Sequence, residues 1–231
     1  MVKSTRVADL AWPEVGRRAS AGVLLLIPLG ATEQHGPHLP LSTDTDIAVS
    51  LCDRIASAGD DIVIAPPVGY GSSGEHAGFP GTLSIGQEAL RLLVVELVRS
   101  ARLTYDAVAL VSAHGGNAEP VRGAVTQLQA EGHRVAMFGP RWEGDPHAGR
   151  AETAMMLALR PDLVRMDRAE SGNTSPLAEL LPELRDGGVR AVSESGVLGD
   201  PTGATAAEGV RLLDELAATM SDEIAQWRAV T

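Results

Sequence analysis

The chain has 231 residues, of which 44% are hydrophobic and 21% are charged, and its formal net charge is −11 at pH 7. This is the composition of a globular protein, and we expect residues 1–231 to form a single domain whose core is large enough to fold without disulfides. The acidic balance argues against nucleic acid or an anionic membrane as partner, because both bind preferentially to basic surfaces.

Apolar runs of strand length alternate along the chain with segments of helical period. This alternation predicts an α/β fold, in which βα units surround a mostly parallel central sheet that is covered on both faces. The segment 170–205 is rich in Gly, Ser and Pro and is expected to form a rim, a lid or a subunit contact. The expected strands are 22–29, 61–65, 107–113 and 134–138, and the expected helices are 46–58, 86–103, 118–131, 148–159 and 206–228.

The most informative segment is the polar loop that follows the first expected strand. Glu33, His35, His38, Asp44 and Asp46 supply carboxylates and imidazoles, which divalent zinc, manganese and iron accept as ligands. Glu33 and His35 are two residues apart, so both side chains leave an extended segment on the same face. Alternatively, Glu33 caps the loop and His35 is a structural histidine. We interpret Glu33, His35 and Asp44 as metal ligands, and we expect His38 and Asp46 to have supporting or capping roles.

Further polar residues follow the third expected strand, and the carboxyl ends of parallel strands meet at one edge of a sheet. His114 comes directly after this strand and is expected to join the metal site. Gly115 and Gly116 allow close backbone approach, and their N–H groups could hold a substrate oxygen or a developing oxyanion. Asn117 would orient this loop or cap the next helix.

The loop after the fourth expected strand carries His147 and Glu152. We expect His147 to lie at the mouth of the cleft and to transfer protons near neutral pH. Glu152 is expected to reach the same cleft as a ligand or a base. The alternative is that Glu152 only complements the dipole of the helix that begins there.

Residues 69–74 match the letters of the dinucleotide-binding fingerprint and follow a strand. The fingerprint requires a helix directly afterwards, and residues 75–81 contain glycine and proline and cannot start one. We therefore exclude nucleotide binding and expect a loop that shapes the cleft, with Glu75 and His76 as substrate contacts. The chain has no G-x-S-x-G motif, and its single cysteine, Cys52, falls within a helical pattern, so no candidate remains for covalent catalysis. No bilayer-length apolar run and no signal peptide is present, which predicts a cytoplasmic protein.

Three segments, 28–41 with Asp44, 112–117 and 147–153, resemble the successive signatures of the creatininase family of metal-dependent amidohydrolases. The resemblance implies a three-layer α/β/α fold and a ring-like homo-oligomer, often a hexamer. It also implies two divalent metal ions per subunit, Zn2+ or Fe2+, with Mn2+ as a further candidate. The residues that it places at the metals are Glu33, His35, Asp44 and His114, with Asp44 as the bridging carboxylate.

One departure from the family pattern concerns the residues after His114. In creatininase proper these include a tyrosine and a glutamate that ligates the second metal, whereas this chain has Gly115 and Gly116. The resemblance then implies Glu152 as the replacement ligand, and it argues against creatinine as the substrate.

The segments 74–85, 172–182 and 196–202 are similar to one branch of this family. Members of that branch remove the C-terminal dipeptide from a modified precursor peptide during the biosynthesis of a redox cofactor, which implies such a peptide as the substrate. Three alternatives stay open: a hydrolase of a small cyclic amide or formamide, a metal-binding scaffold without turnover, and a mononuclear iron oxygenase that uses His35, His114 and Asp44.

Overall fold

The structure is a computed structural model that describes residues 5–57, 61–142 and 144–230. Four parallel strands form its sheet, in the spatial order β2-β1-β3-β4. All four expected strands are confirmed, with ends that differ by at most two residues. Their bounds are β1 (Leu24–Leu29), β2 (Ile62–Ile64), β3 (Ala107–Ser112) and β4 (Val135–Phe138).

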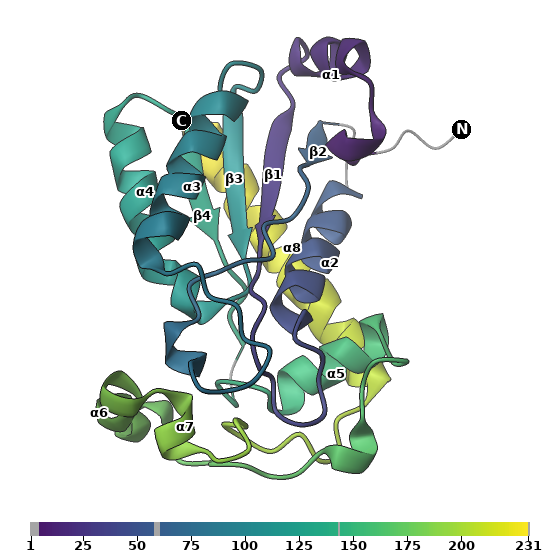
Figure 1. Ribbon diagram of the computed structural model, residues 1–231. Coiled ribbons are helices and arrows are strands. Elements are labelled where there is room, and N and C mark those ends of the chain that lie inside the picture. The colour runs from purple at the N-terminus through teal and green to yellow at the C-terminus, as the bar shows by residue number, and fades with distance from the viewer. Residues whose placement is uncertain (1–4, 58–60, 143, 231) are drawn as a thin grey trace.

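The two faces of the sheet bury separate hydrophobic clusters because successive strand residues point to opposite sides. Leu24 and Leu26 face one cluster, and Leu25 and Ile27 face the other. This arrangement confirms the three-layer α/β/α fold (Figure 1). The first cluster is covered by α2 (Thr43–Ala56), α5 (Arg150–Leu159) and α8 (Ala206–Val230), and the second by α3 (Gln87–Ala101) and α4 (Ala118–Ala130).

Several elements differ from expectation. Helix α2 begins at Thr43 instead of 46, and the end of the expected helix at 58 lies outside the described residues. The segment 170–205 contains two helices, α6 (Leu177–Gly187) and α7 (Val189–Val192), which Pro182 and the flanking glycines concealed. Also unexpected are α1 (Trp12–Ala19) and four single 3-10 turns: η1 (Val7–Asp9), η2 (Gly74–His76), η3 (Gly115–Asn117) and η4 (Met166–Arg168).

The turn η2 lies in the segment that was not expected to start a helix, but it is only three residues long and the next α-helix begins at Gln87. The dinucleotide fingerprint therefore has no helix N-terminus at the required position. Within the described residues, none of the helices has the length and apolarity needed to cross a membrane.

Candidate metal centre

The carboxyl ends of β1, β3 and β4 bring the candidate residues to one edge of the sheet. Leu29 of β1 pairs with Ser112 of β3, so the two strands end at the same level. The chain then passes very close to the first turn of α2, because a Cβ atom at Gly30 would collide with the backbone of Thr45. Asn117 fixes the neighbouring loops through hydrogen bonds from its amide to the Gly30 carbonyl and from the Ser72 N–H to its own oxygen.

Three sets of buried side chains at this edge could each hold a metal ion. In every set the ligand atoms lie within 4.8 Å of one another. Asp44 belongs to two sets, with Oδ1 3.1 Å from His35 Nε2 and Oδ2 3.3 Å from His114 Nδ1. One carboxylate thus faces two histidines with its two oxygens, as a bridging ligand would. The sets are Glu33, Asp44 and His114; His35, Asp44 and Glu152; and Glu33, His35 and His147.

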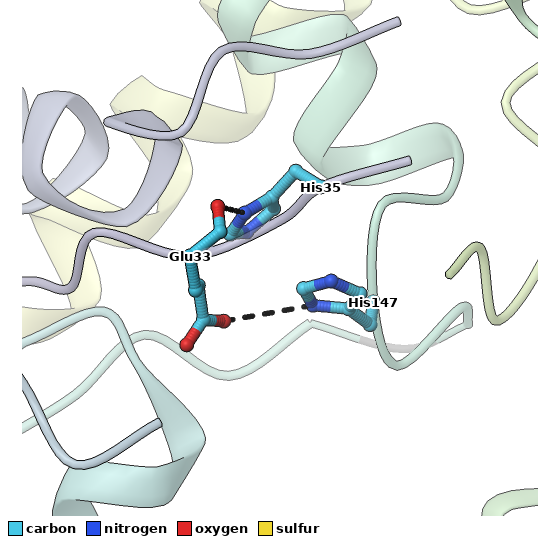
Figure 2. A group of neighbouring side chains, drawn as sticks. All are labelled: Glu33, His35 and His147. Atoms are coloured by element: carbon cyan, nitrogen blue, oxygen red, sulfur yellow. Dashed lines mark hydrogen bonds and ion pairs between the residues drawn. The ribbon is translucent and has the colours of Figure 1, made fainter. Parts of the chain in front are cut away.

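In each histidine of the three sets, one ring nitrogen lies within hydrogen-bond distance of a backbone carbonyl oxygen. His35 Nδ1 lies 3.2 Å from the Glu33 carbonyl oxygen, and His147 Nε2 lies 2.9 Å from that of Gln34. His114 Nε2 lies 2.9 Å from the Ser72 carbonyl oxygen. If these nitrogens carry the protons, the other nitrogen of each ring keeps its lone pair and faces the carboxylates, which is the arrangement of metal-binding histidines. Figure 2 shows the His35 ring beside the Glu33 carbonyl oxygen and the His147 ring beside the Glu33 carboxylate.

The cluster contains buried acceptors that the described protein groups leave unsatisfied. Glu33 Oε2 and Asp44 Oδ2 are fully buried and accept no well-aligned hydrogen bond from the described residues, although His114 ring nitrogens lie 3.2 and 3.3 Å from them. A buried carboxylate oxygen without a partner is costly, and a cation removes that cost. Carboxylate oxygens and imidazole nitrogens are also the donor set that zinc, manganese and iron accept. The residues therefore fit divalent metal ions.

The charged groups of the cluster shift one another's pKa values. Burial and the nearby Asp44 charge raise the pKa of Glu33 to about 8. Burial opposes the charged forms of His35 and His114, but Asp44 outweighs it and raises their pKa values to about 10 and about 9. Burial raises the pKa of Glu152 to about 7, although the His35 charge counteracts it. Without an ion, the cluster thus retains protons at neutral pH.

Metal affinity is expected to rise with pH because an ion must displace these protons. His35, His114 and Glu33 all lose their protons more readily as the pH approaches their raised pKa values. Between about pH 6 and 9 the apparent affinity should rise about tenfold per pH unit for each displaced proton. Calorimetric Zn2+ titrations in two buffers of different ionisation enthalpy measure both the affinity and the protons released. A constant affinity without proton release would show that the metal-free cluster is already deprotonated.

His38 and Asp46, the other candidates of the first loop, lie outside the three sets. His38 is buried and its Nε2 lies 2.9 Å from the Thr153 hydroxyl. Asp46 accepts a hydrogen bond of 2.8 Å from the Ser42 hydroxyl and lies 3.6 Å from Arg160. These contacts give each residue a partner outside the three candidate ligand sets.

His76, which is expected to contact the substrate, lies inside the cluster in this structure. Its ring is buried, with Nε2 3.2 Å from Glu33 Oε1 and Nδ1 2.8 Å from the Gln34 amide nitrogen. Burial, together with the His35 charge, lowers the pKa of His76 to about 3. A neutral His76 can therefore donate to Glu33 and accept from Gln34. Glu75, by contrast, is partly exposed and lies 3.8 Å from His114 Nε2.

The expected position of His147 at the cleft mouth is also wrong. Its ring is buried between those of His35 and His76, with centroid distances of 4.3 and 4.5 Å, although it still lines the cavity. Burial holds the pKa of His147 well below its usual value, so the ring is neutral. Sequence reasoning missed Gln34, which touches both His76 and His147, because an amide is not a typical metal ligand and its two partners are distant in the sequence.

Gly115 and Gly116 differ in the space around them. A Cβ atom at Gly115 would meet nothing within 4 Å, and this residue lines the cavity. A Cβ atom at Gly116 would lie far inside van der Waals contact with Glu75, the Ser72 carbonyl and His114 Nε2. Of the two positions, only 116 requires a glycine, because a larger residue there would collide with the candidate ligand His114.

This difference predicts opposite results for two matched substitutions. Gly116→Ala is expected to displace His114, to lower the free energy of unfolding by about 1 to 3 kcal/mol and to weaken metal binding. Gly115→Ala is expected to leave both nearly unchanged. Thermal denaturation and metal content of the purified variants test the pair. Equal thermal stability and equal metal content of the two variants would contradict the close packing around Gly116.

The chain is similar to known proteins over most of its length. Residues 8–224 match the family model described as creatininase, creatinine amidohydrolase. The "Mycofactocin precursor peptide peptidase" of Mycolicibacterium smegmatis is 51% identical over 212 residues, which cover 89% of this chain and 85% of the relative.

Solved structures of creatininase share the fold of this chain, and the descriptions of two of them name a metal. A structure titled "Creatininase Mn" superimposes with a TM-score of 0.82 at 26% identity, over 97% of this chain and 98% of the other. A mutant creatininase described as "Zn-Zn type" gives a TM-score of 0.81 at 25% identity, over the same shares of the two chains. Both place this chain's candidate metal cluster in a fold for which manganese and zinc are named.

Proposed function

The chain belongs to the creatininase family and is a hydrolase of amide bonds, and we propose that it removes the C-terminal dipeptide from the modified mycofactocin precursor peptide. The observation that carries the metal-dependent chemistry is the pair of buried ligand sets that share Asp44. The substrate is supported by the name of the 51% identical relative. Gly115 and Gly116 support a substrate other than creatinine, because the family resemblance implies bulkier residues after this histidine in creatininase proper.

We propose two divalent ions per subunit, with Zn2+, Fe2+ or Mn2+ as occupants. Glu33, Asp44 and His114 would hold one ion, and His35, Asp44 and Glu152 the other. Bound there, such ions lower the pKa of a water molecule and polarise a carbonyl group. We further propose that residues 1–231 act as one domain and that the chain assembles into a homo-oligomer, for which the family resemblance implies a hexamer.

The remaining residues of the site would handle the proton and the oxyanion. The Nδ1 of the neutral His147 ring faces Glu33 at 4.0 Å, and we propose that it takes a proton from the attacking water and delivers it to the departing amide nitrogen. Glu152 receives the Ala148 N–H at 2.6 Å, which fixes its carboxylate. The N–H groups of Gly115 and Gly116 would stabilise the oxyanion, and the partly exposed Glu75 would contact the peptide.

The decisive experiment offers three substrates to the metal-loaded protein. These are the modified precursor peptide, creatinine and a formamide, with products identified by mass spectrometry. We expect release of the C-terminal dipeptide from the precursor alone. Turnover of either small amide without dipeptide release would instead support the alternative hydrolase, and loss of activity under anaerobic conditions would support the oxygenase.

His147→Ala tests the proton-transfer role separately. We expect this variant to bind metal normally and to lose about 100-fold or more in kcat, the usual contribution of general acid–base catalysis. Metal content is the control, because His147 also belongs to one of the three candidate ion sets. A variant that retains its metal and the full rate would end this assignment.

A further inference from the structure

Two arginines line the cavity that contains the candidate metal ligands. The cavity has a volume of about 610 Å³, and Asp44, His114 and Glu152 form part of its wall. Arg122 reaches it from α4, one turn after Ala118, which also lines it. Arg141 reaches it from the loop that follows β4. The same cavity is therefore lined by ligands of the cluster and by two arginines that have no role in the proposed reaction.

Neither guanidinium makes a hydrogen bond or ion pair with the residues that the structure describes. This contrasts with arginines elsewhere on the surface, such as Arg99, which bonds to Glu131 and Glu96. Arg122 and Arg141 are both exposed, so their five N–H donors each are available to a ligand in the cavity. Paired N–H donors of this kind suit a carboxylate, which they bind in a bidentate manner.

Two acidic residues share the wall beyond the metal ligands. The Asp145 carboxylate is already used, since it accepts the backbone N–H groups of Arg150 at 2.9 Å and Asp200 at 3.0 Å. Glu223 contributes its side chain from α8. A carboxylate ligand would thus be drawn to the two arginines and repelled by Glu223.

The proposed substrate presents a free carboxylate close to the bond that is cut. Release of a C-terminal dipeptide means that the free carboxylate lies two residues beyond the bond that is cut. In an extended chain two residues span about 7 Å. A cavity of this volume is within the usual range for ligand pockets and can hold the departing dipeptide between the metal ligands and the arginines.

We propose that Arg122 and Arg141 bind the C-terminal carboxylate of the peptide and thereby fix the cut at two residues from its end. This inference rests on the proposed peptidase function. It makes the two arginines specificity-determining residues: they recognise the terminus, while the groups around Asp44 act on the amide.

The test compares a free C-terminal carboxylate with a C-terminal amide. The probes are the precursor's own C-terminal dipeptide as acid and as amide, titrated calorimetrically into the metal-loaded protein, and the modified precursor in the same two forms as cleavage substrates. We expect wild type to prefer the acid by about 10- to 100-fold, the effect of one or two hydrogen bonds to a charged group. Arg122→Met and Arg141→Met should each reduce this preference, mainly through KM, and the double variant should abolish it.

Three variants serve as controls. Arg168→Met removes the same charge from an exposed residue outside the cavity wall and should keep the preference. Glu223→Gln removes the opposite charge inside the cavity and should strengthen acid binding. Arg141→Lys keeps the charge and should retain part of the preference. Metal content and thermal stability should match wild type in all of them.

The outcomes separate this inference from the proposed function. Equal binding of acid and amide by wild type, no binding of the acid, or a preference that survives in the double variant overturns the carboxylate site, even if the precursor is cut. Arginine-dependent acid binding without any dipeptide release from the precursor supports the carboxylate site and overturns the peptidase function.

Discussion

Asp44→Asn is expected to empty both proposed ion positions and to lower kcat by on the order of a thousandfold or more. Asp44 is the residue that two of the buried ligand sets share, and its two oxygens face His35 and His114 separately. An amide keeps the shape of the side chain but removes the charge and one oxygen. The two histidines would then face each other without the carboxylate between them.

Asp46→Asn is the matched control for this result. Asp46 lies in the same first turn of α2, but it contacts Ser42 and Arg160 and belongs to none of the described ion sets. We expect this variant to keep its metal and its rate. Metal analysis together with the peptide cleavage assay compares the two variants directly. An Asp44→Asn protein that still holds two ions per subunit would contradict the bridging role.

Glu152→Gln is expected to remove one ion and leave the other. Glu152 completes the set with His35 and Asp44, whereas the set with Glu33 and His114 does not include it. The metal content should therefore fall from two ions per subunit to one, and kcat should fall by about 100-fold or more. The glutamine oxygen can still accept the Ala148 N–H, so the loop beside His147 should keep its structure.

Glu119→Gln distinguishes this role from a simple helix-dipole effect. Glu119 is the acidic residue in the first turn of α4, as Glu152 is in the first turn of α5, but it belongs to none of the described ion sets. If Glu152 only complemented the dipole, both variants would lose about 0.3–1 kcal/mol of stability and both would keep full metal content. A metal loss confined to Glu152→Gln supports its assignment as a ligand.

The strands and the residues that directly follow them could be predicted well because the signals are local. Apolar runs of strand length mark β1 and β3, and the level ends of parallel strands bring the Glu33 loop and His114 together. The start of α2 was harder to predict from the sequence, because the apolar period begins only at Ile47 and the polar first turn resembles a loop.

The burial of the histidines could not be predicted from local pattern. His76 contacts Gln34 across 42 positions of sequence, and His147 contacts it across 113. Such packing depends on how the loops after β1, β2 and β4 meet, and no periodicity encodes it. For the same reason sequence reasoning placed His147 at the cleft mouth, whereas the ring is stacked inside the cluster.

The dispersed origin of the ligands also bears on how the chain resists unfolding. Glu33 and Asp44 come from the region after β1, His114 from the end of β3 and Glu152 from the first turn of α5. Ions bound there would cross-link segments that are more than 100 positions apart, in a chain whose single cysteine cannot form an internal disulfide. An ion at 100 times its dissociation constant adds about 2.7 kcal/mol to the folded state. Metal supply would then raise the free energy of unfolding of the protein as well as its rate of catalysis.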